Sequence, residues 1–229
     1  METLTLTPIA HIETDFPEKF GIPRQSGLVP QLKARIVFEP PYRVREALRG
    51  LEDFSHLWLI WEFSQARREK WSPTVRPPRL GGNTRMGVFA TRSPFRPNPL
   101  GLSCVELDSV DWDAPDGPVL WVRGADLLDG TPIFDVKPYL PYADAHPEAA
   151  GGFAPAAPAP LAVELPNPLP AGMDPDTLAA LRAVLAEDPR PSYQEDPDRE
   201  YGMAFGAWNV KFTVREGALT VHNILPRKN

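Results

Sequence analysis

Proline restricts the fold of this chain more than any other residue. The 229 residues include 29 prolines, about 13%, whereas an average protein has about 5%. Because proline fixes φ and lacks a backbone N–H, it interrupts helices and favours strands that are joined by rigid turns. The composition therefore excludes a bundle of long helices.

Six short segments in the first 140 residues have the pattern of β-strands. They are apolar or β-branched, they are bounded by turn residues, and they cover 3–12, 34–38, 57–63, 86–91, 102–110 and 119–122. Strands of this length and spacing predict a barrel or a sandwich. One helix is expected over 43–51, where apolar residues recur at helical spacing.

The chain changes character after residue 142. Residues 143–175 are rich in Ala, Pro and Gly without periodicity, which predicts a linker or a long surface excursion. A helix is expected next, with Asp174 as its N-cap, Pro175 in its first turn and Leu178, Leu181 and Leu185 on its buried face. A hairpin from Trp208 to Leu225 then turns at Glu216-Gly217. The expected parts are thus 1–142, the linker 143–175, and a small α+β domain at 176–229.

Several classes of protein are not expected. The longest apolar run, 57–61, is far shorter than the ~20 residues that span a bilayer, and the N-terminus lacks the pattern of a signal peptide. The sequence has one cysteine, no CxxC pair, and four histidines without ligand spacing, so we expect no disulfide and no metal. Phosphate-loop and dinucleotide-binding glycine motifs are missing. We expect a cytoplasmic protein without a membrane segment.

Positive charge is concentrated in one segment of an otherwise acidic chain. Residues 67–96 carry eight basic residues and one acid, a net +7, whereas the other 199 residues sum to −13. Such a segment focuses a positive field locally. It is either a solvated basic loop or a surface that binds RNA phosphates, and the interleaved Trp71 and Phe95 suit stacking on bases. The residues that we expect to contact RNA are Arg68, Arg76, Arg79 and Arg85.

Three further stretches are too unusual to be ordinary connectors. They are FGIPRQSGL at 20–28, VRPPRLGGNTRMGVFATRSPFRPNPLGLS at 75–103 and DLLDGTPIFDVKPYLPY at 126–142. Together with GLEDFSHLW at 50–58, they resemble the TsaA/TrmO family of tRNA methyltransferases, which depend on S-adenosylmethionine. The resemblance is dense over 5–142 and continues through DPRPSY at 188–193 and the C-terminal hairpin.

The resemblance implies a mostly β fold, in which a single-sheeted β-barrel carries the catalytic site and is followed by the small α+β domain. It implies a homodimer that methylates N6 of threonylcarbamoyladenosine, next to the anticodon in the anticodon loop of threonine tRNA. It also implies that S-adenosylmethionine binds at one end of the barrel. The cofactor positions in this sequence would be Pro23, Arg24, Gln25, Phe63, Ser64, Arg92, Leu102, Asp126, Leu127, Leu128 and Asp129.

The chemistry of these residues is compatible with that cofactor. Arg92 can pair with the carboxylate of the methionine tail, and Phe63 and Leu102 can wall the adenine. Asp126 or Asp129 can accept hydrogen bonds from the ribose hydroxyls or the adenine amine. A structural alternative for Asp129 is a turn role, because Asp-Gly is a strong turn dipeptide.

The methyl acceptor is a poor nucleophile, because the N6 lone pair is delocalised into the purine and a carbonyl. Asp135, Asp126 and His56 are the possible general bases. Lys137 and Tyr139 are expected to hold the threonyl carboxylate, and Arg96 to bind either that carboxylate or a phosphate. Asn98, stiffened by flanking prolines, is expected to read a base edge. The structural alternatives are a packed strand for 135–142 and a turn for 95–99.

Two rival functions remain at this level. A non-catalytic RNA-binding β-barrel would use the same basic segment and aromatics, but it would have no reason to bind S-adenosylmethionine. The second rival is a methyltransferase of this fold that acts on another RNA or on a small molecule. The net charge of the basic segment weakly disfavours a small neutral acceptor.

Overall fold

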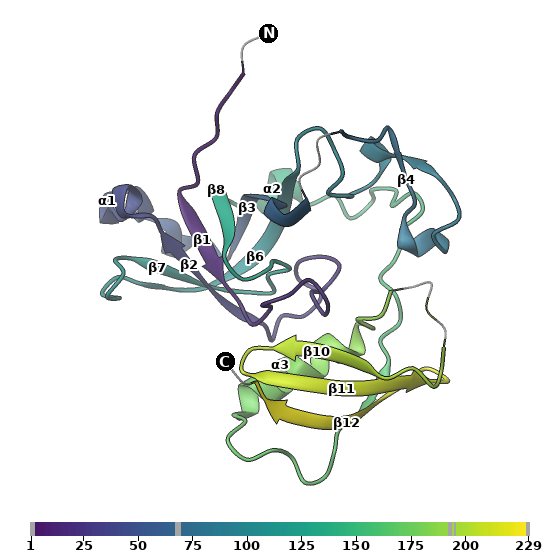
Figure 1. The fold of residues 1–229 in the computed structure, drawn as a ribbon. Coiled ribbons are helices and arrows are strands. Elements are labelled where there is room, and N and C mark those ends of the chain that lie inside the picture. The colour runs from purple at the N-terminus through teal and green to yellow at the C-terminus, as the bar shows by residue number, and fades with distance from the viewer. Residues whose placement is uncertain (1–2, 67–69, 192–193, 195, 228–229) are drawn as a thin grey trace.

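The structure is a computed structural model that describes residues 3–66, 70–191, 194 and 196–227. Figure 1 shows a β-barrel and, beside it, a separate sheet with one helix. The described N-terminal residues run outward from the barrel, and the C-terminus lies near the barrel-facing end of the second sheet. The fold is mostly β, as the sequence predicts.

The barrel closes through six antiparallel strands in the order β1-β2-β7-β6-β3-β8. Their bounds are β1 Ala10–Glu13, β2 Lys33–Phe38, β3 His56–Glu62, β6 Leu100–Asp111, β7 Val119–Arg123 and β8 Thr131–Pro138. Alternate residues point inward, so that Ile12, Ile36, Leu59, Val122 and Ile133 are fully buried in one core. Closure leaves no free sheet edge around the barrel except where strands extend beyond their partners.

Three of the expected elements differ from the structure. Of the segment expected over 3–12, only the last three residues pair as a strand, which is β1 Ala10–Glu13. The segment 86–91 is not a continuous strand: β5 Met86–Gly87 pairs with β4 Thr74–Val75, and a 3-10 turn follows at Val88–Ala90. The helix expected over 43–51 is reduced to α1 Arg45–Leu48, because Gly50 adopts a positive φ of 84° and starts a new 3-10 turn at Leu51–Asp53.

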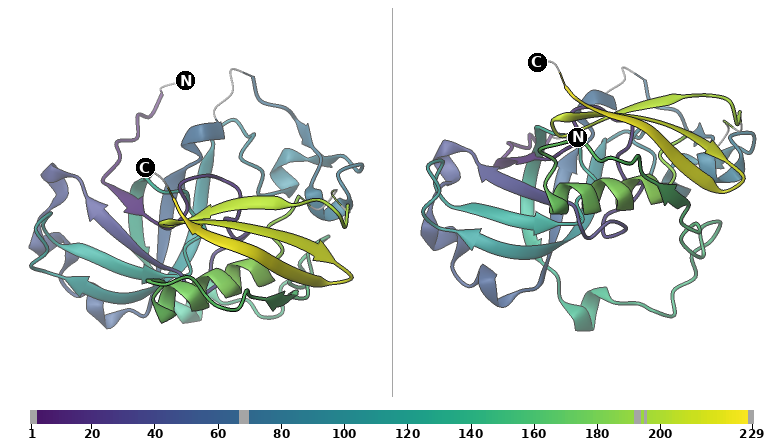
Figure 2. Two further views of the ribbon diagram at one scale, coloured as in Figure 1. Left: turned by 60° about the horizontal axis from the view of Figure 1, so that its bottom comes forward. Right: turned by 90° about the horizontal axis from the view of Figure 1, so that it is seen from below.

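The second sheet has the order β10-β11-β12-β9, with the bounds β10 Tyr201–Phe205, β11 Trp208–Arg215, β12 Ala218–Pro226 and β9 Ala162–Glu164. The β11–β12 hairpin is the predicted one, and its turn residues Glu216 and Gly217 both have positive φ, 48° and 79°. Helix α3, Pro175–Ala186, lies along one face of the sheet (Figure 2). Its N-cap is Asp174, whose carboxylate accepts a hydrogen bond from the Thr177 backbone N–H at 2.9 Å.

Strand β9 lies inside the range 143–175 that we expected to be a linker. It runs parallel to β12, and its Val163 is buried against α3 and the sheet. The short helix α2, Pro141–Asp144, overlaps the start of the same range. The sequence pattern misses β9 because three residues are too few to show an alternation.

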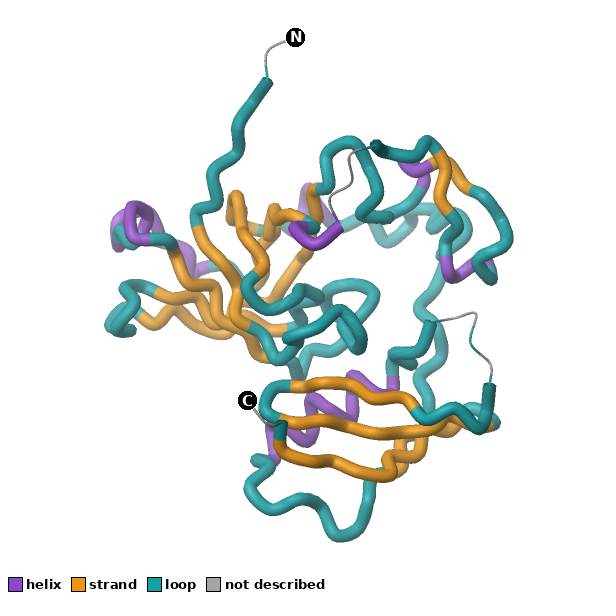
Figure 3. The backbone as a smooth tube through the Cα atoms, in the orientation of Figure 1, coloured by secondary structure: helices purple, strands orange, loops and turns teal. Residues whose placement is uncertain are grey.

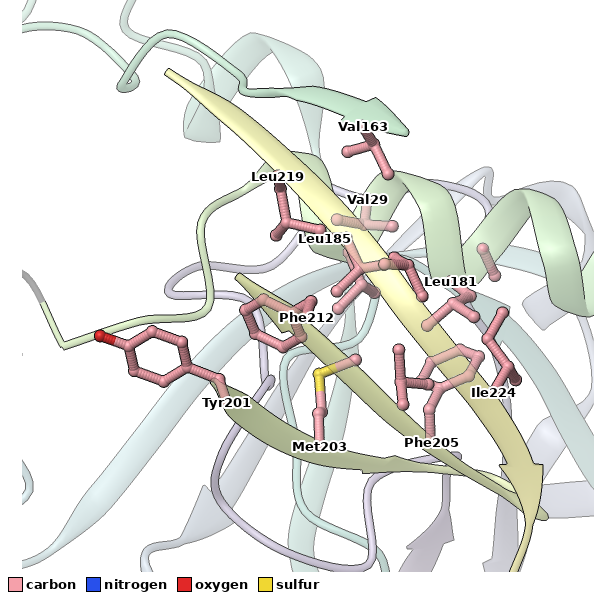
Figure 4. Close-up of a cluster of buried hydrophobic side chains, with 14 of the residues drawn as sticks. Val29, Val163, Leu181, Leu185, Tyr201, Met203, Phe205, Phe212, Leu219 and Ile224 are labelled. Carbon is pink, nitrogen blue, oxygen red and sulfur yellow. The ribbon is translucent and has the colours of Figure 1, made fainter. Parts of the chain in front are cut away.

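The core of the second sheet also takes in residues from the N-terminal part of the chain. Phe16, Val29 and Leu32 are buried in it together with α3 and strands β10–β12. Figure 4 shows Val29 among Leu185, Leu219 and Phe212 of the C-terminal part. Residues 16–32, which join β1 to β2, therefore form the packing surface between barrel and sheet.

Candidate functional site

Residues 23–27 run along a part of β6 that has no strand partner on one side. Strand β6 pairs with β7 only from Glu106 onward, so the edge of its first half is open to a loop. The Ser26 hydroxyl accepts a hydrogen bond from the Cys104 backbone N–H at 3.1 Å, and the Gly27 N–H donates to the Gly124 carbonyl at 2.8 Å. These contacts bring the loop beside both β6 and the segment that follows β7.

Three predicted cofactor residues meet at this junction. Arg92 donates a hydrogen bond from Nη1 to Oε1 of Gln25. The Asp126 carboxylate lies next to them, because it interacts electrostatically with Arg92 and accepts a hydrogen bond from the Ser26 backbone N–H. They come from loops that are more than 30 residues apart in sequence in every case, and the pairing of β2 with β7 and of β7 with β6 places these loops side by side.

The Asp126 side chain is anchored to the barrel by Ser103 on β6. The Ser103 hydroxyl donates to Oδ1 of Asp126 at 2.6 Å and accepts from Nε1 of Trp61 at 3.0 Å. Burial raises the pKa of Asp126 above its ordinary value, while the hydrogen bonds from Ser103 and Ser26 and the charge of Arg92 act in the opposite direction. The site thus presents a carboxyl group that is held in place and poorly hydrated.

Aromatic rings line the end of β3 next to this carboxyl group. The rings of Trp61 and Phe63 are 4.3 Å apart, and the Phe63 N–H donates to the Pro99 carbonyl at 2.9 Å. Ser64 follows on the surface, and Leu102 on β6 is 56% exposed although it is apolar. Pro23 is buried beneath the loop.

The other predicted cofactor residues lie differently. Arg24 points toward the C-terminal part, where its Nη2 donates to the Arg190 carbonyl at 3.0 Å. Leu127 is buried in the barrel core, and Leu128 is half-buried beside it. The Asp129 carboxylate accepts from the Thr14 backbone N–H at 2.9 Å. Asp129 and Gly130 also form the turn that the Thr131 N–H closes on the Leu128 carbonyl at 3.2 Å, as the structural alternative expects.

Three of the residues predicted to handle the methyl acceptor, Asp135, Lys137 and Tyr139, lie on the outer face of β8 or just after it. The register places Leu102, Ile60 and Asp135 side by side across β6, β3 and β8. Neighbouring strands are about 4.8 Å apart, so Asp135 lies roughly 10 Å from Leu102. Lys137 forms an ion pair with Asp135 at 3.0 Å.

Tyr139 follows β8 and packs on the same face. Its ring lies 5.9 Å from the ring of Trp58 and 6.1 Å from that of His56. Trp58 is in turn fixed by Asp144 of α2, which accepts a hydrogen bond from Nε1 at 3.0 Å. The hydrogen bonds from Trp58 and from the Leu140 backbone N–H lower the pKa of Asp144.

Arg96 and Asn98 belong to a loop that is held by its own hydrogen bonds. Arg96 donates from Nη1 to the Thr91 carbonyl at 3.0 Å, and its guanidinium lies 6.0 Å from the centre of the Phe89 ring. Asn98 is exposed, and its backbone carbonyl accepts from the Leu100 N–H at 2.8 Å.

The basic segment forms an excursion that stands away from the barrel, with mostly loops and short helical turns around β4 (Figure 3). Arg76, Arg79 and Arg85 are exposed on it, whereas Arg68 lies outside the described residues. Arg85 donates to the Thr74 hydroxyl at 3.0 Å, and Arg79 to the Ala156 carbonyl. No carboxylate in the described ranges forms an ion pair with these three arginines.

Sequence reasoning missed three residues of the junction: Ser26, Trp61 and Ser103. Ser26 and Ser103 lie inside the unusual stretches 20–28 and 75–103, which was the available signal. Nothing in the sequence distinguishes Trp61 from an ordinary core residue of β3. Within the ranges that the structure covers, no group of His, Cys, Asp and Glu is arranged to hold a metal ion, and no helix has the length and apolar character of a membrane span.

Comparison with known proteins agrees with this architecture. The family profile tRNA-methyltransferase O N-terminal domain matches residues 11–145, and the TrmO C-terminal domain matches 161–227. A tRNA (adenine(37)-N6)-methyltransferase of Escherichia coli K12 is 42% identical over 239 residues, which cover 99% of this chain and 100% of the relative. One of Eikenella corrodens with the same description is 47% identical and covers 75% and 97%.

A solved structure gives the same result at the level of the fold. The crystal structure of TrmO from Pseudomonas aeruginosa superposes with a TM-score of 0.77 at 34% identity, covering 98% of this chain and 99% of that one. The barrel and the C-terminal sheet thus match one family over nearly the whole length. The chain belongs to the TrmO family of tRNA methyltransferases.

Proposed function

We propose that this protein transfers a methyl group from S-adenosylmethionine to N6 of adenosine 37 in tRNA. The observation that carries the proposal is the meeting of Gln25, Arg92 and Asp126, in a chain that matches enzymes of this description from end to end. The rival function, an RNA-binding barrel without catalysis, explains the basic segment but not this buried carboxyl group.

The residues at the junction fit the cofactor. A zwitterionic tail needs a cation for its carboxylate, which Arg92 offers, and hydroxyl or amine donors need an acceptor, which Asp126 offers. Phe63 and the exposed Leu102 supply the apolar wall that an adenine needs. When bound, S-adenosylmethionine supplies a methyl group on a sulfonium sulfur.

The acceptor side of the proposal rests on the outer face of β8. Asp135 is our choice for the base that takes the N6 proton, because it lies in one cross-strand row with Leu102. Its ion pair with Lys137 holds the carboxylate in one orientation. Lys137 and Arg96 offer positive charge to the threonyl carboxylate of threonylcarbamoyladenosine, while Tyr139 and Asn98 border the base.

The basic excursion is proposed to bind the anticodon stem and loop. Arg76, Arg79 and Arg85 have no described acidic partner, so their charge is available to phosphates. The exposed rings of Trp71 and Phe89 lie 6.0 Å apart on the same excursion and offer a platform for stacking. We further propose that the enzyme acts as a homodimer in the cytoplasm, where tRNA is modified.

The test has two parts. Isothermal titration with S-adenosylmethionine should give saturable binding, and methyl transfer to purified threonine tRNA should produce a methylated nucleoside at position 37. Sedimentation analysis measures the oligomeric state independently. Binding of tRNA without any binding of S-adenosylmethionine would contradict the proposal and favour the non-catalytic barrel.

A further inference from the structure

One buried hydroxyl in the barrel has both of its hydrogen-bonding roles taken by functional neighbours. Ser103 is 1% exposed and lies on the inward face of β6, opposite the buried Leu59. An indole N–H can only donate, so the hydroxyl must accept from Trp61 at 3.0 Å. Its single proton is then left for Asp126, whose Oδ1 lies 2.6 Å away. The direction of this hydrogen-bond chain is therefore fixed.

The first member of the chain is held rigidly. Trp61 and Gly101 are cross-strand partners, and a Cβ at Gly101 would lie 2.6 Å from Cδ2 of the indole and closer still to two other ring atoms. The ring consequently lies against the β6 backbone, a position that only glycine permits. Phe63 covers it at 4.3 Å between ring centres. The indole has little freedom to turn its N–H away from Ser103.

Asp126, the last residue of this hydrogen-bond series, depends on Ser103, because none of its other contacts anchors it to a barrel strand. The remaining neighbours of Asp126 are the Ser26 N–H, the charge of Arg92 and its own backbone N–H, and all of them belong to loops. Ser103 is the partner that stands on a strand of the closed barrel. Ser103 therefore holds the Asp126 carboxyl group in a fixed position relative to β3 and β6, although that group otherwise lies among loops.

We propose that Ser103 is a positioning residue of the cofactor site, and that Trp61 and Ser103 together orient the Asp126 carboxylate toward the bound cofactor. The inference rests on the proposed function, because it takes Asp126 as the acceptor for cofactor donors. Ser103 does not itself touch the reacting atoms. It acts by keeping Asp126 in one orientation and in its charged form.

The pH dependence separates this role from a merely structural one. Burial raises the pKa of Asp126, and the Ser103 hydrogen bond is the strongest influence against that rise; Arg92 is the charged neighbour. Without the hydroxyl, the pKa rises further, so the carboxylate is protonated at a higher pH. Loss of cofactor affinity on acidification should then begin at a higher pH in Ser103→Ala than in the natural protein.

The experiment compares four variants of the full chain by titration with S-adenosylmethionine across a pH series. Ser103→Ala should weaken binding roughly 10- to 100-fold, the effect of losing a hydrogen bond to a charged group, and should shift the acid limb upward. Ser103→Thr keeps the hydroxyl and should retain most of the affinity. Trp61→Phe removes the donor to Ser103 together with part of the ring volume, leaves the Ser103–Asp126 hydrogen bond in place, and should give a smaller loss. Ser109→Ala, an exposed serine on the same strand, is the control.

The outcomes are distinguishable. Natural affinity and an unshifted pH profile in Ser103→Ala would overturn the inference while leaving the proposed function intact. Equal losses in Ser103→Ala and Ser103→Thr, with parallel pH profiles, would also overturn it, because they indicate a packing effect. Absence of binding by the natural protein would instead contradict the proposed function. If Ser103→Ala does not fold, Trp61→Phe still tests the hydrogen-bond series, through the pH dependence of its affinity for S-adenosylmethionine.

Discussion

Arg24 donates a hydrogen bond to the backbone carbonyl of Arg190 at 3.0 Å, and this contact joins the loop at 23–27 to the C-terminal part of the molecule. Arg190 is itself fixed by two hydrogen bonds of 2.8 Å to the Asp188 carboxylate. The loop that borders the proposed cofactor site is thus clamped between β6 on one side and the segment after α3 on the other. The C-terminal part therefore supports the site as well as packing on the barrel.

The first prediction tests this support at Gly21. A Cβ there would lie 2.9 Å from Cγ of Met203 and closer to its sulfur, and Met203 is buried. Gly21→Ala should lower the free energy of unfolding by about 1–3 kcal/mol and weaken binding of S-adenosylmethionine. Urea denaturation and titration measure the two effects.

Gly27→Ala is the matched control for that substitution. Gly27 also has a positive φ, 78°, but no atom would lie within 4 Å of its Cβ. The free energy of unfolding of Gly27→Ala should fall only by the cost of placing alanine in this backbone conformation, roughly 1 kcal/mol. Equal losses at the two positions would show that contact with Met203 contributes nothing to the docking of the loop.

The second prediction concerns salt. If the excursion around β4 contacts phosphates, the logarithm of tRNA affinity should fall linearly with the logarithm of salt concentration, and Arg76→Ala should reduce the slope by about 0.7–0.9. Arg49→Ala, which removes the same charge from an exposed position near α1, should leave the slope unchanged. Identical slopes for both variants would remove the excursion from the binding surface.

The third prediction concerns Asp144 of α2, whose carboxylate accepts the hydrogen bond from the Trp58 indole N–H. Its pKa is lowered by the hydrogen bonds from Leu140 and Trp58, so its stabilising effect is present above the ordinary carboxyl pKa and is lost as pH falls through the lowered value. The Trp58 indole N–H resonance should shift during such an acid titration. In Asp144→Ala it should stay constant; a shift that persists there would assign the titration to another group.

The sequence predicted the strands correctly where an apolar or alternating pattern is uninterrupted. It failed to predict a strand where proline lies at the strand end. Segments 34–38, 57–63, 102–110 and 119–122 all form barrel strands. Strand β8 was not predicted as one, because Pro132 and Pro138 bracket it; proline at a strand terminus costs little, since few ladder hydrogen bonds are lost there. Strand β10 was missed because Gly202 interrupts its short pattern.

Part of the candidate site could likewise be predicted from the sequence, and part could not. Family resemblance named Gln25, Arg92 and Asp126, and the structure brings these three together. It could not reveal the contact between Ser103 and Asp126, because the sequence does not give the register of the β6–β7 hairpin, which places Asp126 beside Ser103 just past the Glu106–Arg123 pair. Local patterns do not encode such long-range pairs, whereas the buried hydroxyl between two polar groups is evident in three dimensions.

The last prediction separates the two residues of the ion pair on β8. Asp135→Asn keeps the shape of the side chain but removes the proposed base, so kcat should fall while the affinity for S-adenosylmethionine stays near normal.

Lys137→Ala should act on substrate choice, because the threonyl carboxylate loses a cation. The natural enzyme should prefer purified threonine tRNA over an unmodified transcript by more than the ~10–200-fold that a difference in shape alone provides. This ratio should shrink in Lys137→Ala and persist in Asp135→Asn. Lys137 is 62% exposed, so its share of the ratio should be modest, with Arg96 supplying the rest. Comparable rates of the natural enzyme on both RNAs would exclude recognition of the carboxylate and leave an adenosine methyltransferase of another specificity.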